Sequence, residues 1–182
     1  MTHIASIGAG LHSSLDLHST ALSAAEIAAV LVDEDNVTTG FPSLFGNGEY
    51  TSIGNVREFP AMGTPPNIVN VPVYGQASSQ QIQGQSDSPS MELQLNFVPD
   101  DWDASSTLGA MVGDGNTYCF RFALLNSAPT SLDEAGMVAD NSLYYWFGKI
   151  EALQVTPSLT DANTATVTIS IQSDFYGAYT SA

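Results

Sequence analysis

The sequence predicts a mainly β fold of the α+β class, a β-sandwich or partly closed barrel with one flanking α-helix. Three observations support this prediction. Several segments alternate apolar and polar residues with the period of two that half-buried strands show. Turns rich in Gly and Pro separate those segments. The order of strands, then one helix, then strands is typical of a sheet domain with a helix packed on one side.

The first 48 residues differ from the rest, and we expect them to form an N-terminal arm. Residues 1–22 show no clear periodicity. Ser23 and Glu26 have the spacing of a capping box, in which each side chain bonds the other residue's backbone amide. Apolar residues behind it predict a short helix at about residues 23–32. Gly and Pro in residues 40–48 then mark a boundary, so the β domain is expected at residues 49–182.

The first part of the β domain contains two expected strands and a long polar segment. Residues 50–59 and 67–74 favour strands, whereas residues 75–89 are rich in Gln, Ser and Gly. The polar segment is either a mobile loop or a segment that a neighbouring molecule orders. We therefore take six of its residues as candidates for an assembly loop: Gln76, Gln80, Gln81, Ile82, Gln85 and Asp87.

The second part of the domain alternates most clearly. Apolar residues at every second position from Met91 to Phe97 predict a half-buried strand. A helix is expected at about residues 100–112, with the carboxylates of Asp100, Asp101 and Asp103 capping its positive end. Further strands are expected at residues 118–124, 143–155 and 164–172, the last two as a hairpin.

The charge balance excludes several function classes. Against 19 Asp and Glu there are three Lys and Arg, which gives a formal net charge of −16. Three cations cannot neutralise a phosphate backbone, so a protein that grips nucleic acid is excluded. Binding to an anionic membrane is disfavoured for the same reason. Charged residues make up only 12% of the chain, so neutral polar residues must cover much of the surface, as in proteins with large subunit contacts.

No convincing catalytic or cofactor site is visible in the sequence. His12 and His18 with Asp16 match no metal-binding spacing, and helix capping explains the three aspartates near residue 100 without a cation. Cys119, the single cysteine, is expected to be a buried hydrophobe. The aromatic run at residues 144–147 alternates between the two faces of a strand, so we expect core and subunit contacts rather than a stacking platform. We therefore expect a protein that is not an enzyme and has no cofactor.

Targeting signals are also not visible. The chain shows neither a secretory signal nor an apolar run of the ~20 residues that span a bilayer. We expect synthesis in the cytoplasm of the host cell and no membrane partner.

Residues 49–174 resemble the major tail tube proteins of long-tailed, non-contractile bacteriophages, the siphophages. The resemblance rests on Pro-Asp-Asp-Trp-Asp103 with a Gly-Asp-Gly turn, Tyr118-Cys-Phe-Arg-Phe, Tyr145-Trp-Phe-Gly-Lys-Ile-Glu151 and Thr164-Ala-Thr-Val-Thr-Ile-Ser-Ile. Upstream, Ile53-Gly-Asn-Val56, the turn at residues 60–66 and Ile68-Val-Asn-Val also fit.

This resemblance implies a virion protein of the tail. In that family six subunits form a ring whose strands join into an inner β-barrel, and stacked rings form a hollow tube that conducts duplex DNA. The implied partners are copies of the chain, a tape measure protein, and tail terminator and tip proteins. DNA would pass without specific binding, since wall carboxylates repel phosphates.

Seven residues are candidates for the wall of such a lumen because they lie in or beside predicted strands and alternate with apolar residues. They are Glu92, Gln94, Asn96, Glu151, Thr166, Thr168 and Asp174. The simpler interpretation is that these side chains face solvent on the outside.

Two other functions stay open at this point. A tail terminator or head–tail joining protein would form one ring and stop. A β-sandwich carbohydrate-binding or receptor-binding module would remain a discrete species with a fixed aromatic platform.

Overall fold

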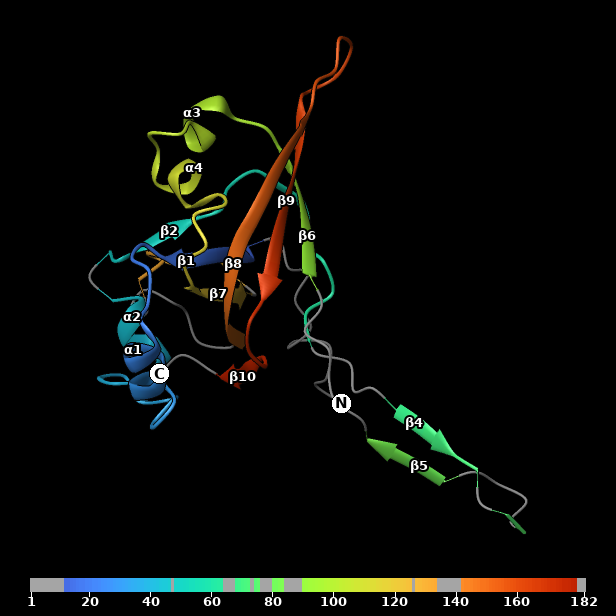
Figure 1. Cartoon of the computed structure of the whole chain (residues 1–182). Helices are drawn as coiled ribbons and strands as arrows, with labels where there is room; N and C mark the ends of the chain where they lie inside the picture. Colours follow the sequence, from blue (N-terminus) through green and yellow to red (C-terminus); the bar gives the residue numbers. More distant parts are fainter. Residues whose placement is uncertain are drawn as a thin grey trace, which may run out of the picture.

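The structure, a computed structural model, describes residues 12–46, 48–63, 68–72, 74–75, 80–83, 90–125, 127–133 and 142–179. An antiparallel eight-stranded sheet dominates it, in the order β2-β1-β7-β8-β9-β6-β3, and β10 pairs with β8 (Figure 1). Its strands are β1 (Ser14–His18), β2 (Tyr50–Ser52), β3 (Val56–Glu58), β6 (Ser90–Asn96), β7 (Tyr118–Leu124), β8 (Ser142–Thr156), β9 (Thr164–Ile171) and β10 (Tyr176–Tyr179). A separate two-stranded sheet pairs β4 (Ile68–Val71) with β5 (Gln80–Gln83). The prediction of a mainly β fold is confirmed, and the large sheet does not close into a barrel.

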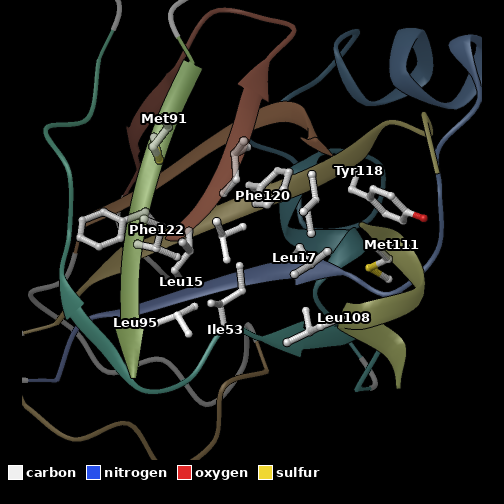
Figure 2. Packing of buried hydrophobic residues seen from close by; sticks show 14 of the residues in the cluster. Leu15, Leu17, Ile53, Met91, Leu95, Leu108, Met111, Tyr118, Phe120 and Phe122 are labelled. Carbon is white, nitrogen blue, oxygen red and sulfur yellow. The ribbon is translucent and has the colours of Figure 1, made fainter. Parts of the chain in front are cut away.

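The main core lies on one face of the sheet, which we call the inner face. Strands from both ends of the sheet order contribute to one cluster, with Leu15 and Leu17 of β1 packing together with Leu93 and Leu95 of β6. Figure 2 shows these strands directing their apolar side chains toward a common interior, with Leu108 and Met111 at its side. The period-two alternation predicted for β6 and β9 is confirmed, because every second residue of each strand is buried in this cluster.

The predicted helix at residues 100–112 is instead two short helices, α3 (Pro99–Trp102) and α4 (Thr107–Met111). Asp103 takes extended backbone angles, and its carboxylate accepts bonds from the Ser105 amide and hydroxyl. Ser106 then caps α4 by accepting from the Gly109 amide. Short polar side chains that bond nearby backbone interrupt a helix in this way.

The predicted helix caps are therefore only partly correct. Asp100 and Asp101 do lie in the first turn of α3, where the dipole favours carboxylates. Neither makes a capping hydrogen bond, and the N-cap residue is Val98. Asp103 lies at the C-terminal end of α3, so its assignment to the helix start was wrong.

The largest correction concerns the N-terminal arm. Ser14–His18 form β1, which lies inside the large sheet between β2 and β7. The predicted capping box is present and starts α1 (Ala24–Val30), close to the expected bounds. A further helix, α2 (Phe41–Leu44), was not predicted. Residues 14–18 thus belong to the β domain and not to an arm outside it.

A second cluster covers part of the other face of the sheet, which we call the outer face. Phe41 has no exposed surface, and its ring stacks on Tyr145 at 4.9 Å between centroids. Phe45 is also fully buried, and Tyr176 of β10 packs against Phe41 at 5.1 Å. This part of the chain is therefore core.

The expected strand at residues 50–59 is divided into β2 and β3, and Asn55 between them has a φ of 59°. Strand β10 was not predicted. In the polar segment at 75–89, Gln80–Gln83 form β5 against β4, so these four residues are not a structureless loop. Gln residues give a weak strand signal, and the pairing depends on β4.

Candidate functional site: a polar sheet face and two projecting hairpins

The outer face of β6 and β9 carries a regular array of polar side chains, most of them neutral. Glu92 lies opposite Thr168, Gln94 opposite Thr166, and Asn96 opposite Thr164. The β6 residues are exposed and the β9 threonines are half-buried. Because directly opposed residues in antiparallel strands share a face, the structure brings five of the seven lumen candidates together.

The two other candidates have different positions. Glu151 lies where the β8–β9 register shifts, and it accepts a hydrogen bond of 2.6 Å from the Ser170 hydroxyl, which attaches it to the polar face. Asp174 is exposed but lies beyond the end of β9, outside the paired rows. The candidate face is thus Glu92, Gln94, Asn96, Glu151, Thr166 and Thr168, and we call it the polar face.

The polar face also contains one cation. Lys149 lies opposite Ser170, so it belongs to the same row of side chains. Its charge also contributes to the environment of Asp114: burial would raise the pKa of that carboxyl, but bonds from Tyr118 and Asn116, with a smaller effect of Lys149, lower it. The face therefore combines two carboxylates and one cation with neutral side chains, and the presence of Lys149 was not predicted.

The β4–β5 hairpin projects away from the body of the protein (Figure 1). Val69 of β4 lies opposite Ile82 of β5, and these side chains are 47% and 56% exposed. The assembly candidates Gln81 and Ile82 are exposed on β5, and Gln80 is the first residue of that strand. Gln76, Gln85 and Asp87 lie outside the described residues. An isolated two-stranded hairpin has only marginal stability in water.

A second projection is the β8–β9 hairpin, whose turn extends beyond the other strands (Figure 1). The turn is held internally: Asn163 accepts from the Ser158 amide at 2.9 Å, and Ser158 accepts from the Asp161 amide at 3.0 Å. Leu159 at its tip is fully exposed, and Val155 at its base is 43% exposed. The hairpin thus presents apolar side chains on an ordered turn.

A buried ion pair joins the neighbouring strands β1 and β7. Asp16 of β1 and Arg121 of β7 have no exposed surface, and Arg121 Nη2 donates to Asp16 Oδ2 at 2.8 Å. Ser52 also donates to this carboxylate, and the guanidinium lies 4.4 Å from the centre of the Phe45 ring. Every polar group named here is paired, so the cluster has a structural role. The sequence feature that could have predicted this cluster is the position of Arg121 within an apolar strand.

The aromatic run in β8 supplies no stacking platform. Tyr145 and Phe147 pack in the outer cluster, whereas Trp146 stacks on Phe120 in the inner one, at 5.6 Å between centroids. These three residues are at most 2% exposed. The prediction that consecutive aromatics divide between the two faces is confirmed, and their use in the core is also confirmed.

Over the described residues, no group of three or more His, Cys, Asp or Glu is arranged to hold a metal ion. His12 is exposed, whereas His18 is buried with Nδ1 2.8 Å from the Thr20 carbonyl oxygen. Within the same ranges, no helix has the length and apolar character needed to cross a bilayer.

Comparison of the chain with protein-family models and with characterised proteins gives no match.

Proposed function

We propose that this chain is a structural subunit that assembles with copies of itself, and specifically a subunit of a phage tail tube built from stacked rings. The observation that carries self-assembly is the β4–β5 hairpin. Its two strands pair only with each other among the strands described, so both outer edges present backbone amides and carbonyls. Strands with free edges readily pair with another chain.

The contrast with the large sheet strengthens this argument. The strands at the two ends of that sheet's main order, β2 and β3, have only three residues each, and β3 carries Arg57 and Glu58. Short and charged edge strands are a common protection against unwanted pairing. The hairpin sequences Ile-Val-Asn-Val and Gln-Gln-Ile-Gln contain no charge. A partner strand would also stabilise an otherwise marginal hairpin.

The tail-tube part of the proposal depends on the resemblance over residues 49–174, and the polar face is consistent with it. A wall of Gln, Asn and Thr with few cations offers a passing polyanion few attachment points. In the assembled tube, the strands of the polar face would join those of neighbouring copies into an inner barrel. Each subunit would then have the β-sandwich form that the sequence predicts.

The test is assembly of the full-length chain, followed by light scattering and negative-stain microscopy over a range of concentrations. We expect rings and hollow filaments that grow with concentration. Ile82→Lys places a charge on the hairpin and should leave small discrete particles. Leu124→Lys, at an exposed apolar residue of β7 that is 42% exposed, is the matched control and should assemble normally.

Three outcomes would count against the proposal. Small particles at every concentration and salt level would exclude a tube subunit and favour a discrete binding module. A single ring that never stacks would favour a tail terminator or joining protein. Normal tubes from Ile82→Lys would show that the hairpin is not the assembly element.

A further inference from the structure

The C-terminal half of strand β8 has a free edge. Strand β7 pairs with β8 only as far as Gly148, whereas β9 follows β8 to Thr156. Beyond the end of β7, the Gly113 amide donates to the Ile150 carbonyl oxygen at 2.8 Å, and no described backbone group bonds residues 152–156 on this side. Figure 1 shows β8 and β9 extending past α3 in this region. Backbone amides and carbonyls along this edge can therefore bond another strand.

This edge lacks the protection that the ends of the large sheet have. Residues 152–156 are Ala-Leu-Gln-Val-Thr and contain no charge. The strands β2 and β3 are by contrast only three residues long, and β3 is charged. A longer, uncharged edge is a template for pairing with another chain. In a protein with a formal net charge of −16, such an edge also adds no carboxylate of its own to a contact with a second copy.

The side chains of this edge divide into an apolar row and a polar row. Val155 lies opposite Ala165, which is buried in the main core, so Val155 faces the inner side of the sheet. Its side chain is nevertheless 43% exposed. Gln154 lies opposite Thr166 and faces the polar side. A strand that continues the sheet here needs aliphatic residues toward the inner face and neutral polar residues toward the polar face.

The β4–β5 hairpin has the same division of side chains. Val69 lies opposite Ile82 on one of its faces, and Asn70 lies opposite Gln81 on the other. Val69 and Ile82 are 47% and 56% exposed, and the two amide side chains are also exposed. Added to β8, the hairpin would place its aliphatic residues beside Val155 and its amides beside the polar face. The joined sheet would bury apolar surface that each part alone leaves in water.

The hairpin and the β8 edge lie on opposite sides of the same part of the sheet. The order β8-β9-β6-β3 places β8 at one side, and the hairpin is formed by the chain between β3 and β6 at the other. Figure 1 shows the hairpin projecting away from β8. Two different surfaces on opposite sides of a subunit make a head-to-tail contact, which repeats from copy to copy and closes a ring where the rotation allows it.

We propose that the β4–β5 hairpin of one copy pairs with residues 152–156 of β8 in the next copy. This inference rests on the proposed function, because it names the surface that receives the hairpin in the proposed assembly. The contact links the polar-face strands of neighbouring copies through the hairpin. It keeps the apolar sides of the two copies aligned with each other, and likewise their polar sides.

The test uses two full-length variants that each lose one side of the contact. Ile82→Lys damages the hairpin and keeps the β8 edge, whereas Val155→Lys places a charge on the edge and keeps the hairpin. Each variant alone should remain monomeric in analytical ultracentrifugation. An equimolar mixture has one intact contact and should give 1:1 dimers but no rings. Gln94→Lys puts the same charge on an exposed residue of β6, away from the β8 edge, and as the matched control it should assemble like the native protein.

The outcomes separate this inference from the proposed function. If the native protein assembles and Ile82→Lys does not, assembly through the hairpin stands whatever Val155→Lys does. Normal assembly of Val155→Lys would then overturn only the β8 edge as the receiving surface. Dimers of Val155→Lys alone would overturn it in favour of pairing between hairpins, and dimers of Ile82→Lys alone in favour of pairing between two β8 edges. A mixture that stays monomeric at every concentration would overturn it as well.

A milder variant keeps the test decisive if circular dichroism shows that Val155→Lys does not fold. Val155→Thr keeps the branched shape that strands favour but puts a hydroxyl group into the apolar row. We expect Val155→Thr to need about tenfold more protein than the native chain before it assembles. Assembly of both at the same concentration would contradict the burial of Val155 in the contact.

Discussion

Replacing Phe41 with Ala tests whether the segment around α2 belongs to the core. Phe41 has no exposed surface, and its ring lies 4.9 Å from Tyr145, 5.1 Å from Tyr176 and 5.5 Å from Phe147 between centroids. Truncation of a buried Phe removes its transfer free energy and leaves a cavity, which together cost about 3–5 kcal/mol. A domain has a total stability of about 5–15 kcal/mol. We therefore expect Phe41→Ala to lose a large share of the free energy of unfolding.

The assay is urea denaturation followed by circular dichroism, at a concentration where light scattering shows a single small species. With a slope of about 2 kcal/mol per molar urea, the midpoint should fall by roughly 1.5–2.5 M. Val37→Ala is the matched control, because Val37 lies four residues away in sequence and is 64% exposed. Its free energy of unfolding should change by less than about 0.5 kcal/mol. A loss below about 1 kcal/mol for Phe41→Ala would show that this segment is a detachable arm after all.

Three further substitutions test other parts of the fold. Arg121→Met leaves the fully buried carboxylate of Asp16 without its cation, and urea denaturation should show a loss of about 3–5 kcal/mol; a loss below about 1 kcal/mol would mean that the pair is not buried. Gly40→Ala places a Cβ 2.4 Å from the Asp33 carbonyl oxygen, so thermal melting should show that this variant is destabilised. A Cβ at Gly54 meets nothing within 4 Å, so Gly54→Ala should melt at nearly the native temperature. Equal melting temperatures of the two variants would contradict the close approach of Gly40 to the backbone of Asp33 and Glu34. Burial and the bond to a carboxylate raise the pKa of Tyr118 to about 12, so its phenol should titrate later than an ordinary tyrosine by absorbance. Because the unfolded chain loses this proton near pH 10, the stabilising contribution is present below pH 10 and is lost as the pH rises toward 12. Tyr118→Phe should flatten that loss, and an unchanged pH profile would refute the assignment.

Local sequence patterns predicted the elements whose formation depends on short-range physics. The capping box of Ser23 and Glu26 is present because both bonds form within four residues. The alternation in β6 and β9 separates one buried face from one exposed face, as the period of a strand requires. The opposed aromatics of β8 follow from the same geometry.

Sequence alternation predicted most of the polar face, and the strand register completed it. Alternation identified Glu92, Gln94, Asn96, Thr166 and Thr168 as outward-facing, and the β6–β9 register places them in matched rows. It could not show that Lys149 joins them, because strand register between distant segments depends on the whole sheet. Asp174 lies outside this face because it follows the end of β9, just as it followed the expected strand at residues 164–172.

Local sequence patterns were sufficient to predict the mainly β character of this protein and the faces of its most regular strands, and the composition alone gives its scarcity of cations. Tertiary structure alone decided that residues 14–18 are an inner strand and that Phe41 and Phe45 are core. The reason is distance along the chain: Asp16 can be buried only because Arg121, 105 residues later, pairs with it. Without that partner, burial of the Asp16 carboxylate would be prohibitively unfavourable. The segment Ser-Leu-Asp-Leu-His therefore does not predict a core strand, because local sequence does not show that a distant arginine will pair with its aspartate.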